Sequence, residues 1–312
     1  MLKKFLSLIK KSQTIVITGH VSPDADSLGS IIALTHALKK LKKTVIPLCE
    51  ESPEQKYHHL GCNILEKKVV GIPDLLIIVD CYQQKRLGEV GKKLFKSSQN
   101  ILIIDHHPAP KHLIDNHYIR PQAVSTTYLV GQLISELNTK LTKEIALPLY
   151  TGIMIDSNSF RSPSVDADTH RMVAKLLETG IDPATTFNKI YGGKNFKHIK
   201  FLGEVLLSAK TRGKIAWIKI DRKILDKYKV SPRDTLYFVN NLLIIDDISI
   251  VCVFRQEGNQ IKVGLRSNKT DVGKLASILG GGGHRHIAAA LINGTMDNVI
   301  KNTISIFDKL VS

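Results

Sequence analysis

The chain has 312 residues, and its hydrophobic fraction of 43% is that of a globular protein and excludes a disordered one. No apolar run reaches the roughly 18–20 residues that span a bilayer, and the length suffices for two domains with separate cores. The 44 Lys and Arg residues outnumber the 28 Asp and Glu residues and leave a net charge of +16, which favours a nucleic acid or nucleotide partner through phosphate neutralisation.

The first eleven residues predict an amphipathic helix. The apolar stretch there is too short for a signal peptide, Lys10 and Lys11 interrupt it, and no small-residue cleavage site follows. The four cysteines show no Cys-x-x-Cys spacing, and isolated thiols in apolar segments are typical of a reducing compartment. We therefore expect a cytoplasmic protein that is not bound to a membrane.

The first half of the chain alternates short runs rich in Ile and Val with amphipathic segments, which predicts a parallel sheet with helices on both faces. The expected strands are 14–19, 44–49, 74–80 and 101–105. The expected helices are at about 27–42, 125–138, 142–156, 168–179 and 183–190. We assign these elements to one α/β domain over residues 1–190.

A breaker cluster at 191–195 precedes a helix at about 195–209, and we expect residues 191–212 to link two domains. The pattern then changes to that of a smaller α+β domain over residues 213–312. The expected elements are a strand at 214–220, a hairpin of 249–255 and 260–266, a helix at about 271–279, four glycines at 280–283, and a helix at about 296–310. The active site is expected in the cleft between the two domains.

Acids and histidines end four of the buried-looking segments of the first domain. They are the motif from His20 to Asp26, the isolated Asp80, the triplet Asp105-His106-His107, and Asp156 at the end of a predicted helix. Parallel strands that end at one edge of a sheet would gather these side chains in one cleft. Carboxylates suit Mg²⁺ or Ca²⁺, and the added imidazoles shift the preference toward Mn²⁺. We therefore expect a site for two cations that share a bridging carboxylate and activate a water.

These residues resemble the four motifs of the DHH phosphoesterase family, and the resemblance covers nearly the whole chain. It implies one cation held by His20, Asp24 and Asp80. It implies a second cation held by Asp26, Asp80, His106 and Asp156, with Asp80 bridging the two. It also implies that Asp105 orients a ligating histidine and that His107 faces the scissile phosphate, so that Asp80, Asp105 and His107 act in catalysis.

The fourth motif departs from the family pattern. Family members commonly continue it as Asp-Thr-Gly, whereas this chain has Asp156-Ser157-Asn158. Ser supplies a hydroxyl in place of Thr, and Asn tolerates left-handed backbone better than most residues. We therefore expect the departure to be conservative.

A glycine cluster, Gly280-Gly281-Gly282-Gly283-His284, follows the hairpin strand that ends at Arg266-Ser267. Successive glycines let backbone N–H groups approach an anion closely. The arrangement resembles the DHH-associated C-terminal domain, which implies that substrate is bound by Arg266, Ser267, Gly281, Gly282, Gly283 and His284. The family usually has a Gly where this chain reads Ala288-Ala289-Ala290, so we expect altered packing at the start of a helix there.

This second domain distinguishes among the relatives. Family pyrophosphatases lack Gly-Gly-Gly-His and RecJ-type exonucleases are longer, so the chain resembles the nanoRNase/pAp-phosphatase (NrnA-like) group. The resemblance implies a phosphoester hydrolase with two divalent cations, Mn²⁺ in preference to Mg²⁺. Its implied activities are the degradation of short RNA or DNA oligonucleotides to mononucleotides and the removal of the 3′-phosphate from 3′-phosphoadenosine 5′-phosphate.

Several alternatives stay open. Hydrolysis of cyclic di-AMP, pApA or pGpG uses the same reacting group and the same metals. The protein could instead belong to a different functional class, as a nucleotide-binding regulator without catalysis, although the intact set of acids argues against this alternative. A nucleic-acid scaffold would rest on the charge of +16 alone. The sequence also leaves open whether the protein is a homodimer.

Overall fold

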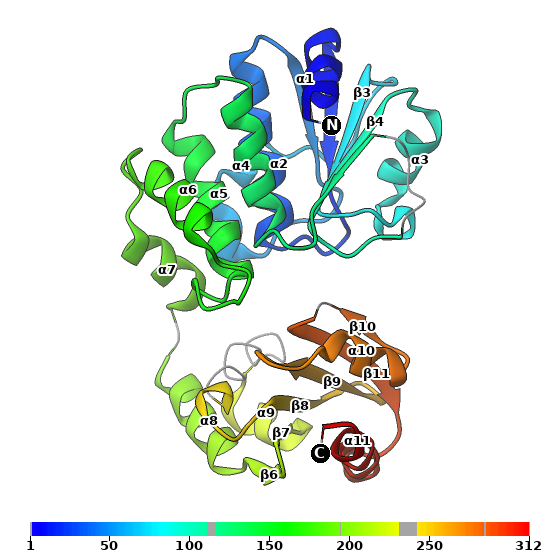
Figure 1. The fold of residues 1–312 in the computed structure, drawn as a ribbon, viewed down its shortest axis with the longest axis vertical. Helices are drawn as coiled ribbons and strands as arrows, with labels where there is room; N and C mark the ends of the chain where they lie inside the picture. The colour runs from blue at the N-terminus through cyan, green and yellow to red at the C-terminus, as the bar shows by residue number, and fades with distance from the viewer. Residues whose placement is uncertain (1, 111–115, 194, 231–241, 284, 312) are drawn as a thin grey trace. The chain divides into compact units, whose positions relative to one another are not determined.

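The computed structural model describes residues 2–110, 116–193, 195–230, 242–283 and 285–311 (Figure 1). The chain divides into two compact units, Met1–Gly192 and Gly193–Ser312, and each is described by itself. The helix expected in the linker belongs to the second unit. It packs there through Phe201 and Val205, which lie in one apolar cluster with Ile218.

The first unit is built on a five-stranded parallel sheet, as the Ile- and Val-rich runs predict. Its strand order is β2-β1-β3-β4-β5, and each adjacent pair is parallel. The strands are β1 (Thr14–Thr18), β2 (Thr44–Leu48), β3 (Leu75–Val79), β4 (Ile101–Asp105) and β5 (His117–Ile119). Sequence patterning did not predict β5, a three-residue edge strand whose residues are only partly buried.

Helices cover both faces of this sheet (Figure 1). The helices of this unit are α1 (Leu2–Lys11), α2 (Ala25–Lys40), α3 (Glu89–Ser97), α4 (Thr126–Glu136), α5 (Lys143–Asp156), α6 (Ala167–Leu177) and α7 (Pro183–Tyr191), of which α6 and α7 lie beyond α4 and α5 in Figure 1. One large apolar cluster joins the sheet to α1, α2, α4 and α5, and α1 contributes the buried Phe5 and Ile9 to it. A smaller cluster joins the opposite face to α3 through Leu94. The first unit is therefore a three-layer α/β domain.

The second unit has a six-stranded mixed sheet in the order β10-β11-β9-β8-β7-β6. The strands are β6 (Lys210–Arg212), β7 (Ile215–Ile220), β8 (Ile250–Glu257), β9 (Gln260–Arg266), β10 (Gly282–Gly283) and β11 (Ile287–Asn293). The pair β7–β8 is parallel, and the other adjacent pairs are antiparallel. Its helices are α8 (Phe196–Leu207), α9 (Arg222–Tyr228), α10 (Val272–Ile278) and α11 (Met296–Val311).

The alanine run at 288–290 lies in strand β11, so the expectation of a helix start there is wrong. Ala favours helices in isolation, but here both sides of the strand are paired. Ala289 pairs with Gly264 of β9 on one side and with Gly282 of β10 on the other. The small alanine side chains leave room for the glycine strand at this edge, so tertiary pairing overrides local propensity.

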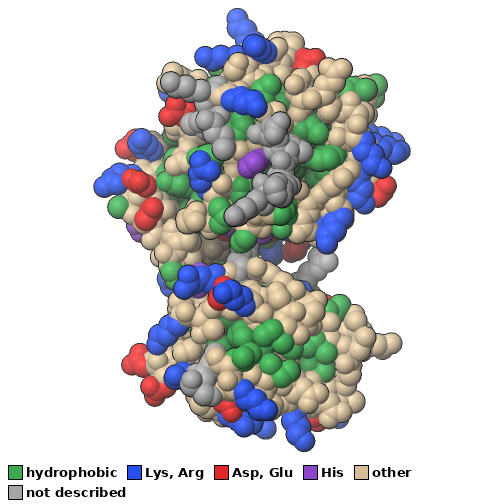
Figure 2. Space-filling view, turned by 45° about the vertical axis from the view of Figure 1, so that its right-hand side comes forward, with side chains coloured by type: hydrophobic (Ala, Val, Ile, Leu, Met, Phe, Trp, Pro, Cys, Tyr) green, Lys and Arg blue, Asp and Glu red, His purple; other side chains and the backbone are tan. Residues whose placement is uncertain are grey.

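None of the described helices combines the length and the apolar character that crossing a membrane requires. Positive side chains lie on both units in the face that Figure 2 shows, as the net charge of +16 leads one to expect. The charge is thus not concentrated in one tail of the sequence.

Candidate metal centre and the glycine strand

The carboxyl ends of three parallel strands carry acids and histidines. His20 follows β1, Asp80 follows β3, and the Asp105-His106 pair ends β4. Neighbouring parallel strands end at the same edge, so these side chains meet there. Helix α2 starts at the same place, with Asp24 as its N-cap accepting from the backbone N–H groups of Asp26 and Ser27.

A first group of potential ligands consists of His20, Asp24 and Asp80. His20 Nε2 lies 3.3 Å from Asp80 Oδ2 and 4.0 Å from Asp24 Oδ1. The other ring nitrogen of His20, Nδ1, lies 2.7 Å from the carbonyl oxygen of Val21. Donation from Nδ1 to that carbonyl leaves the lone pair on Nε2, directed at the acids, which is the tautomer that a metal ligand needs.

A second group consists of Asp26, His106 and Asp156. His106 Nε2 lies 3.1 Å from Asp156 Oδ2 and 3.7 Å from Asp26 Oδ2, while its Nδ1 lies 3.3 Å from the carbonyl oxygen of Ala123. Asp80 connects the two groups, because its Oδ2 faces His20 and its Oδ1 lies 4.0 Å from His106 Nε2. This is the position that a bridging carboxylate occupies between two cations.

The N-terminus of α4 holds two of these acids in place. Asp26 accepts hydrogen bonds from the backbone N–H groups of Thr126 and Thr127, each at 2.7 Å, and from the Thr127 hydroxyl at 2.6 Å. The Thr126 hydroxyl donates to Asp80 Oδ1 at 3.1 Å. The sequence did not predict these contacts, because they join residues 46 to 101 positions apart.

The triplet at the end of β4 divides its contacts in a way that differs from the expectation. Asp105 is fully buried and accepts hydrogen bonds from the backbone N–H and the Nδ1 of His107, at 2.9 and 2.7 Å. It therefore orients His107 and not the ligand candidate His106. His107 Nδ1 also lies 3.4 Å from Asp80 Oδ1, which places this ring beside both groups.

Two glycines let the helices that carry the acids pack closely. A Cβ on Gly29 of α2 would lie 2.5 Å from the carbonyl oxygen of Pro148 in α5, and one on Gly152 of α5 would lie 2.5 Å from the Thr127 hydroxyl. Both distances are shorter than a carbon can approach these atoms. The glycines thus allow α5 to bring Asp156 to Asp26 and His106.

The chain leaves α5 through an unusual left-handed turn. Asn158, Ser159 and Phe160 have φ angles of 52°, 57° and 64°, a conformation that costs L-residues about 1–2 kcal/mol each. The Ser157 hydroxyl accepts from the N–H of Phe160 at 2.9 Å, and the N–H of Ser159 donates to Met154 at 2.7 Å. Asn158 thus adopts left-handed backbone, which Asn tolerates better than most residues.

The electrostatics of the cluster suit divalent cations. Burial raises the pKa of Asp80 well above its ordinary range, and the charges of Asp26 and Asp24 raise it further. Burial and the charge of Asp26 also raise the pKa of Asp156 to about 6. Burial lowers the pKa of His106, but its hydrogen bond to Asp156 and the surrounding carboxylates outweigh burial and leave that pKa raised. Acids crowded in this way repel one another, and bound cations would relieve the repulsion.

The second unit brings Arg266 near the glycine strand. Arg266 at the end of β9 pairs in register with Ile287 of β11, and the next residue, Ala288, pairs with Gly283 of β10. Burial lowers the pKa of the Arg266 guanidinium to about 10, so it stays charged at neutral pH. No described acidic side chain forms an ion pair with Arg266, which leaves its charge available to an anion.

The other residues predicted to bind substrate differ in how accessible the structure leaves them. A Cβ on Gly281 would collide with the carbonyl oxygen of Ala289, whereas one on Gly282 would meet nothing within 4 Å. The Ser267 hydroxyl donates to the carbonyl oxygen of Ser249 at 2.6 Å and accepts from two backbone N–H groups, so it serves the turn after β9. His284 lies outside the described residues.

Comparisons with known proteins agree with this arrangement. The DHH family, N-terminal domain, matches residues 14–153, and the DHHA1 domain matches residues 203–312. An uncharacterised protein of Mycoplasma genitalium is 28% identical over 94% of this chain and 90% of its own length. A bifunctional oligoribonuclease and PAP phosphatase, NrnA, of Mycoplasma pneumoniae is also 28% identical, over 94% of this chain and 91% of its own.

A solved structure has the same fold over nearly the full length. It is an exopolyphosphatase-related protein from Bacteroides fragilis, with a TM-score of 0.88 and 25% identity, covering 99% of this chain and 96% of that one. The similarity in fold thus covers residues of both units.

Proposed function

Because the chain belongs to the DHH family and carries a DHHA1 domain in its second half, we propose that it is a hydrolase of short oligonucleotides. It would release mononucleotides and also remove the 3′-phosphate from 3′-phosphoadenosine 5′-phosphate. The observation that carries the proposal is the shared acid Asp80, which faces one ligand group with each carboxylate oxygen. The relative named NrnA supports the choice of substrate.

In this proposal two divalent cations, Mn²⁺ in preference to Mg²⁺, occupy the two groups. The first group is His20, Asp24 and Asp80, and the second is Asp26, Asp80, His106 and Asp156. When bound, such cations polarise phosphoryl oxygens and lower the pKa of a water molecule to near neutrality. The protein's own part is to hold six ligand residues on rigid strand and helix ends, with Thr126 and Thr127 fixing two of the acids.

His107 would contact the scissile phosphate. Its hydrogen bond to the buried Asp105 holds the proton on Nδ1 and fixes the orientation of the ring. In the protonated ring Nε2 then donates to a phosphate oxygen, or delivers its proton to the leaving oxygen. Asp105 acts through His107 and does not contact the substrate in this scheme.

Arg266 and the glycine strand would hold a terminal phosphate of the substrate. A charged guanidinium without an acidic partner among the described residues is a site for an anion. Gly282 has open space where a side chain would stand, so its backbone can be approached closely. Recognition of a terminal phosphate would favour substrates of a few nucleotides.

The proposal is tested by incubating the full chain with Mn²⁺ and six compounds, followed by chromatography of the products. They are pApA, a 5-mer RNA, a 24-mer RNA, 3′-phosphoadenosine 5′-phosphate, cyclic di-AMP and pyrophosphate. We expect turnover of pApA, the 5-mer and the bisphosphate, and slow turnover of the 24-mer. Activity on pyrophosphate alone, or equal rates on the 5-mer and the 24-mer, would contradict the proposal.

Asp80→Asn serves as the test of chemistry, with Asp168→Asn as its matched control. Loss of the bridging charge is expected to abolish turnover of every substrate, whereas Asp168 is exposed and pairs with Arg171 on the surface of α6. Retained turnover in Asp80→Asn would show that the cluster is not the catalytic site.

A further inference from the structure

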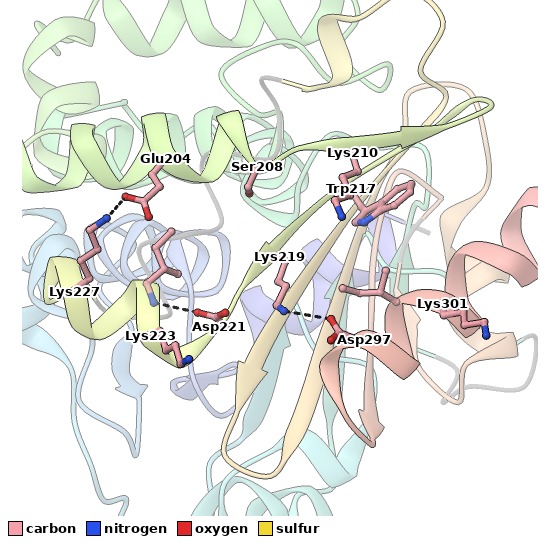
Figure 3. Close-up of a pocket in the computed structure, with 12 residues that line it drawn as sticks. Glu204, Ser208, Lys210, Trp217, Lys219, Asp221, Lys223, Lys227, Asp297 and Lys301 are labelled. Atoms are coloured by element: carbon pink, nitrogen blue, oxygen red, sulfur yellow. Dashed lines mark hydrogen bonds and ion pairs between the residues drawn. The ribbon is translucent and has the colours of Figure 1, made fainter.

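A pocket of about 570 Å³ lies at one edge of the sheet in the second unit (Figure 3). Its walls come from β6, β7, α8, α9 and the first turns of α11. The glycine strand β10 forms the opposite edge of the same sheet, five strand spacings away. At about 4.8 Å per spacing this is on the order of 24 Å, so the pocket is distinct from the glycine strand. Arg266 lies nearer, on β9, but it is not among the residues that line the pocket.

The pocket is lined by more positive than negative side chains. Its five lysines are Lys210, Lys219, Lys223, Lys227 and Lys301, and its acids are Glu204, Asp221 and Asp297. Lys227 is engaged by Glu204 at 2.6 Å, and Asp221 is occupied in capping α9. No described residue forms an ion pair with Lys210, Lys223 or Lys301. The pocket therefore holds positive charge in excess of what its own acids neutralise.

Lys219 is held only weakly. Its ion pair with Asp297 has a separation of 3.3 Å, and the Asp297 side chain is 86% exposed. Exposed pairs of this kind contribute little to stability because water screens them. An anionic ligand that enters the pocket can therefore take the place of Asp297 on Lys219.

The only tryptophan of the chain, Trp217, forms an aromatic wall of the pocket. It packs against the apolar cluster beneath α11 and remains partly exposed. Lys210 stands directly opposite Trp217 in the β6–β7 register, and Lys219 follows two residues along β7 on the same face of the sheet (Figure 3). An aromatic surface thus lies between two cations.

We propose that this pocket is a second binding site, for a nucleoside phosphate. The base stacks on Trp217 and the phosphate pairs with Lys219 and Lys223, with Lys210 beside the base. Stacking on an aromatic side chain next to lysines is how proteins bind nucleotides without reading their sequence. The volume is within the range of small-ligand pockets, about 300–1,000 Å³. Inorganic phosphate alone would make no contact with the aromatic wall, and an apolar ligand would give the lysines no negative charge to pair with.

The proposal does not depend on the hydrolytic function, and binding to the full chain tests it. AMP is titrated while the fluorescence of Trp217 is followed, with excitation at wavelengths longer than those that adenine absorbs. The same titration is made with adenosine, with inorganic phosphate and with a 5′-phosphorylated 5-mer RNA. The variants are Lys219→Met/Lys223→Met in the pocket, Lys274→Met on the exposed side of α10 as a matched control, and Arg266→Ala to remove the other anion site.

We expect saturable quenching by AMP, with adenosine and phosphate each binding at least about tenfold more weakly, which corresponds to about 1.4 kcal/mol. The double lysine variant should lose a similar factor, while Lys274→Met and Arg266→Ala keep the wild-type affinity. Equal affinities for AMP and the 5-mer identify a free mononucleotide as the ligand. Much tighter binding of the 5-mer identifies the 5′ end of an RNA chain as the ligand. Both results support a nucleoside-phosphate site.

Three results would overturn the proposal. They are no saturable quenching by AMP, quenching by inorganic phosphate as strong as that by AMP, and equal losses in Lys274→Met and the double variant. Any of them would rule out a nucleoside-phosphate site at Trp217 and the pocket lysines. Equilibrium dialysis of labelled AMP with Trp217→Phe, which retains an aromatic wall, provides a readout independent of fluorescence and is expected to retain binding.

Discussion

Asp80 shows at the scale of one residue how the site is made. It is a buried carboxylate with a φ of 56°, a left-handed conformation that is uncommon for residues other than Gly, although Asp adopts it more often than most. The turn directs its two oxygens toward different histidines, Oδ2 toward His20 and Oδ1 toward His106. Strained backbone of this kind persists where surrounding contacts hold it, and it is common at functional sites.

Thr127 offers a prediction at the same scale. Thr127→Val keeps the shape of the side chain but removes the hydroxyl that donates to Asp26 at 2.6 Å. Loss of a contact that orients a metal ligand typically costs about 10–100-fold in metal affinity, and the lost hydrogen bond lowers the free energy of unfolding by about 1 kcal/mol. The Mn²⁺ concentration for half-maximal activity and a urea titration measure these two effects.

Thr139→Val is the matched control, because the Thr139 hydroxyl is buried without a hydrogen-bond partner among the described residues. It should be neutral or stabilising and leave the Mn²⁺ dependence unchanged. If Thr127→Val has the same Mn²⁺ dependence as Thr139→Val, the hydroxyl does not position Asp26.

The left-handed turn after α5 is a feature of an element end, and Asn158 tests it. Asn158→Gly and Asn158→Val both remove the hydrogen bond from Arg161 Nη2 to Asn158 Oδ1. Gly adopts positive φ freely, whereas a β-branched residue does so at a large cost. We expect Asn158→Gly to leave the free energy of unfolding within about 0.5 kcal/mol of wild type and Asn158→Val to lower it by about 1–2 kcal/mol. Equal losses in urea titrations would assign the effect to the Arg161 contact instead.

The glycine strand supports a second prediction at the element scale. Neither Gly281 nor Gly282 has a positive φ, so only steric space distinguishes them. Gly281→Ala forces a Cβ into the Ala289 carbonyl and is expected to lower the free energy of unfolding by about 1–3 kcal/mol. Gly282→Ala has open space and should be stable, yet it should raise KM, because its methyl group occupies the approach to the backbone. Urea titration and steady-state kinetics separate these effects, and an unchanged KM in Gly282→Ala would argue against a phosphate contact there.

At the scale of the whole molecule, the net charge of +16 stands in contrast to the acidic cluster. Phosphate-bearing substrates are attracted by the surface charge, which salt screens, whereas the acids of the cluster are mostly buried and are screened less. We expect KM to rise with KCl concentration, more steeply for a 5-mer RNA than for pApA because more phosphates are neutralised. The Mn²⁺ dependence should change much less. Equal salt dependence of the two substrates would show that contacts beyond the first phosphates are absent.

The amino-acid sequence by itself determined the elements of the first unit that carry the chemistry. Hydrophobic runs of period and length typical of parallel strands end on His20, Asp80 and Asp105, and parallel strands must end at one edge. The parallel sheet and the α/β class followed from these local patterns. The position of Asp156 at a helix end followed in the same way.

Tertiary structure alone decided what the local patterns do not encode. Strand β11 forms because its alanines pair with β9 and the glycine strand, against their helical propensity. The contacts of Thr126 and Thr127 with Asp26, and the approach of Lys301 to the pocket of Trp217, join residues distant in sequence. Such contacts depend on how elements pack, and packing is not a property of any single stretch of the chain.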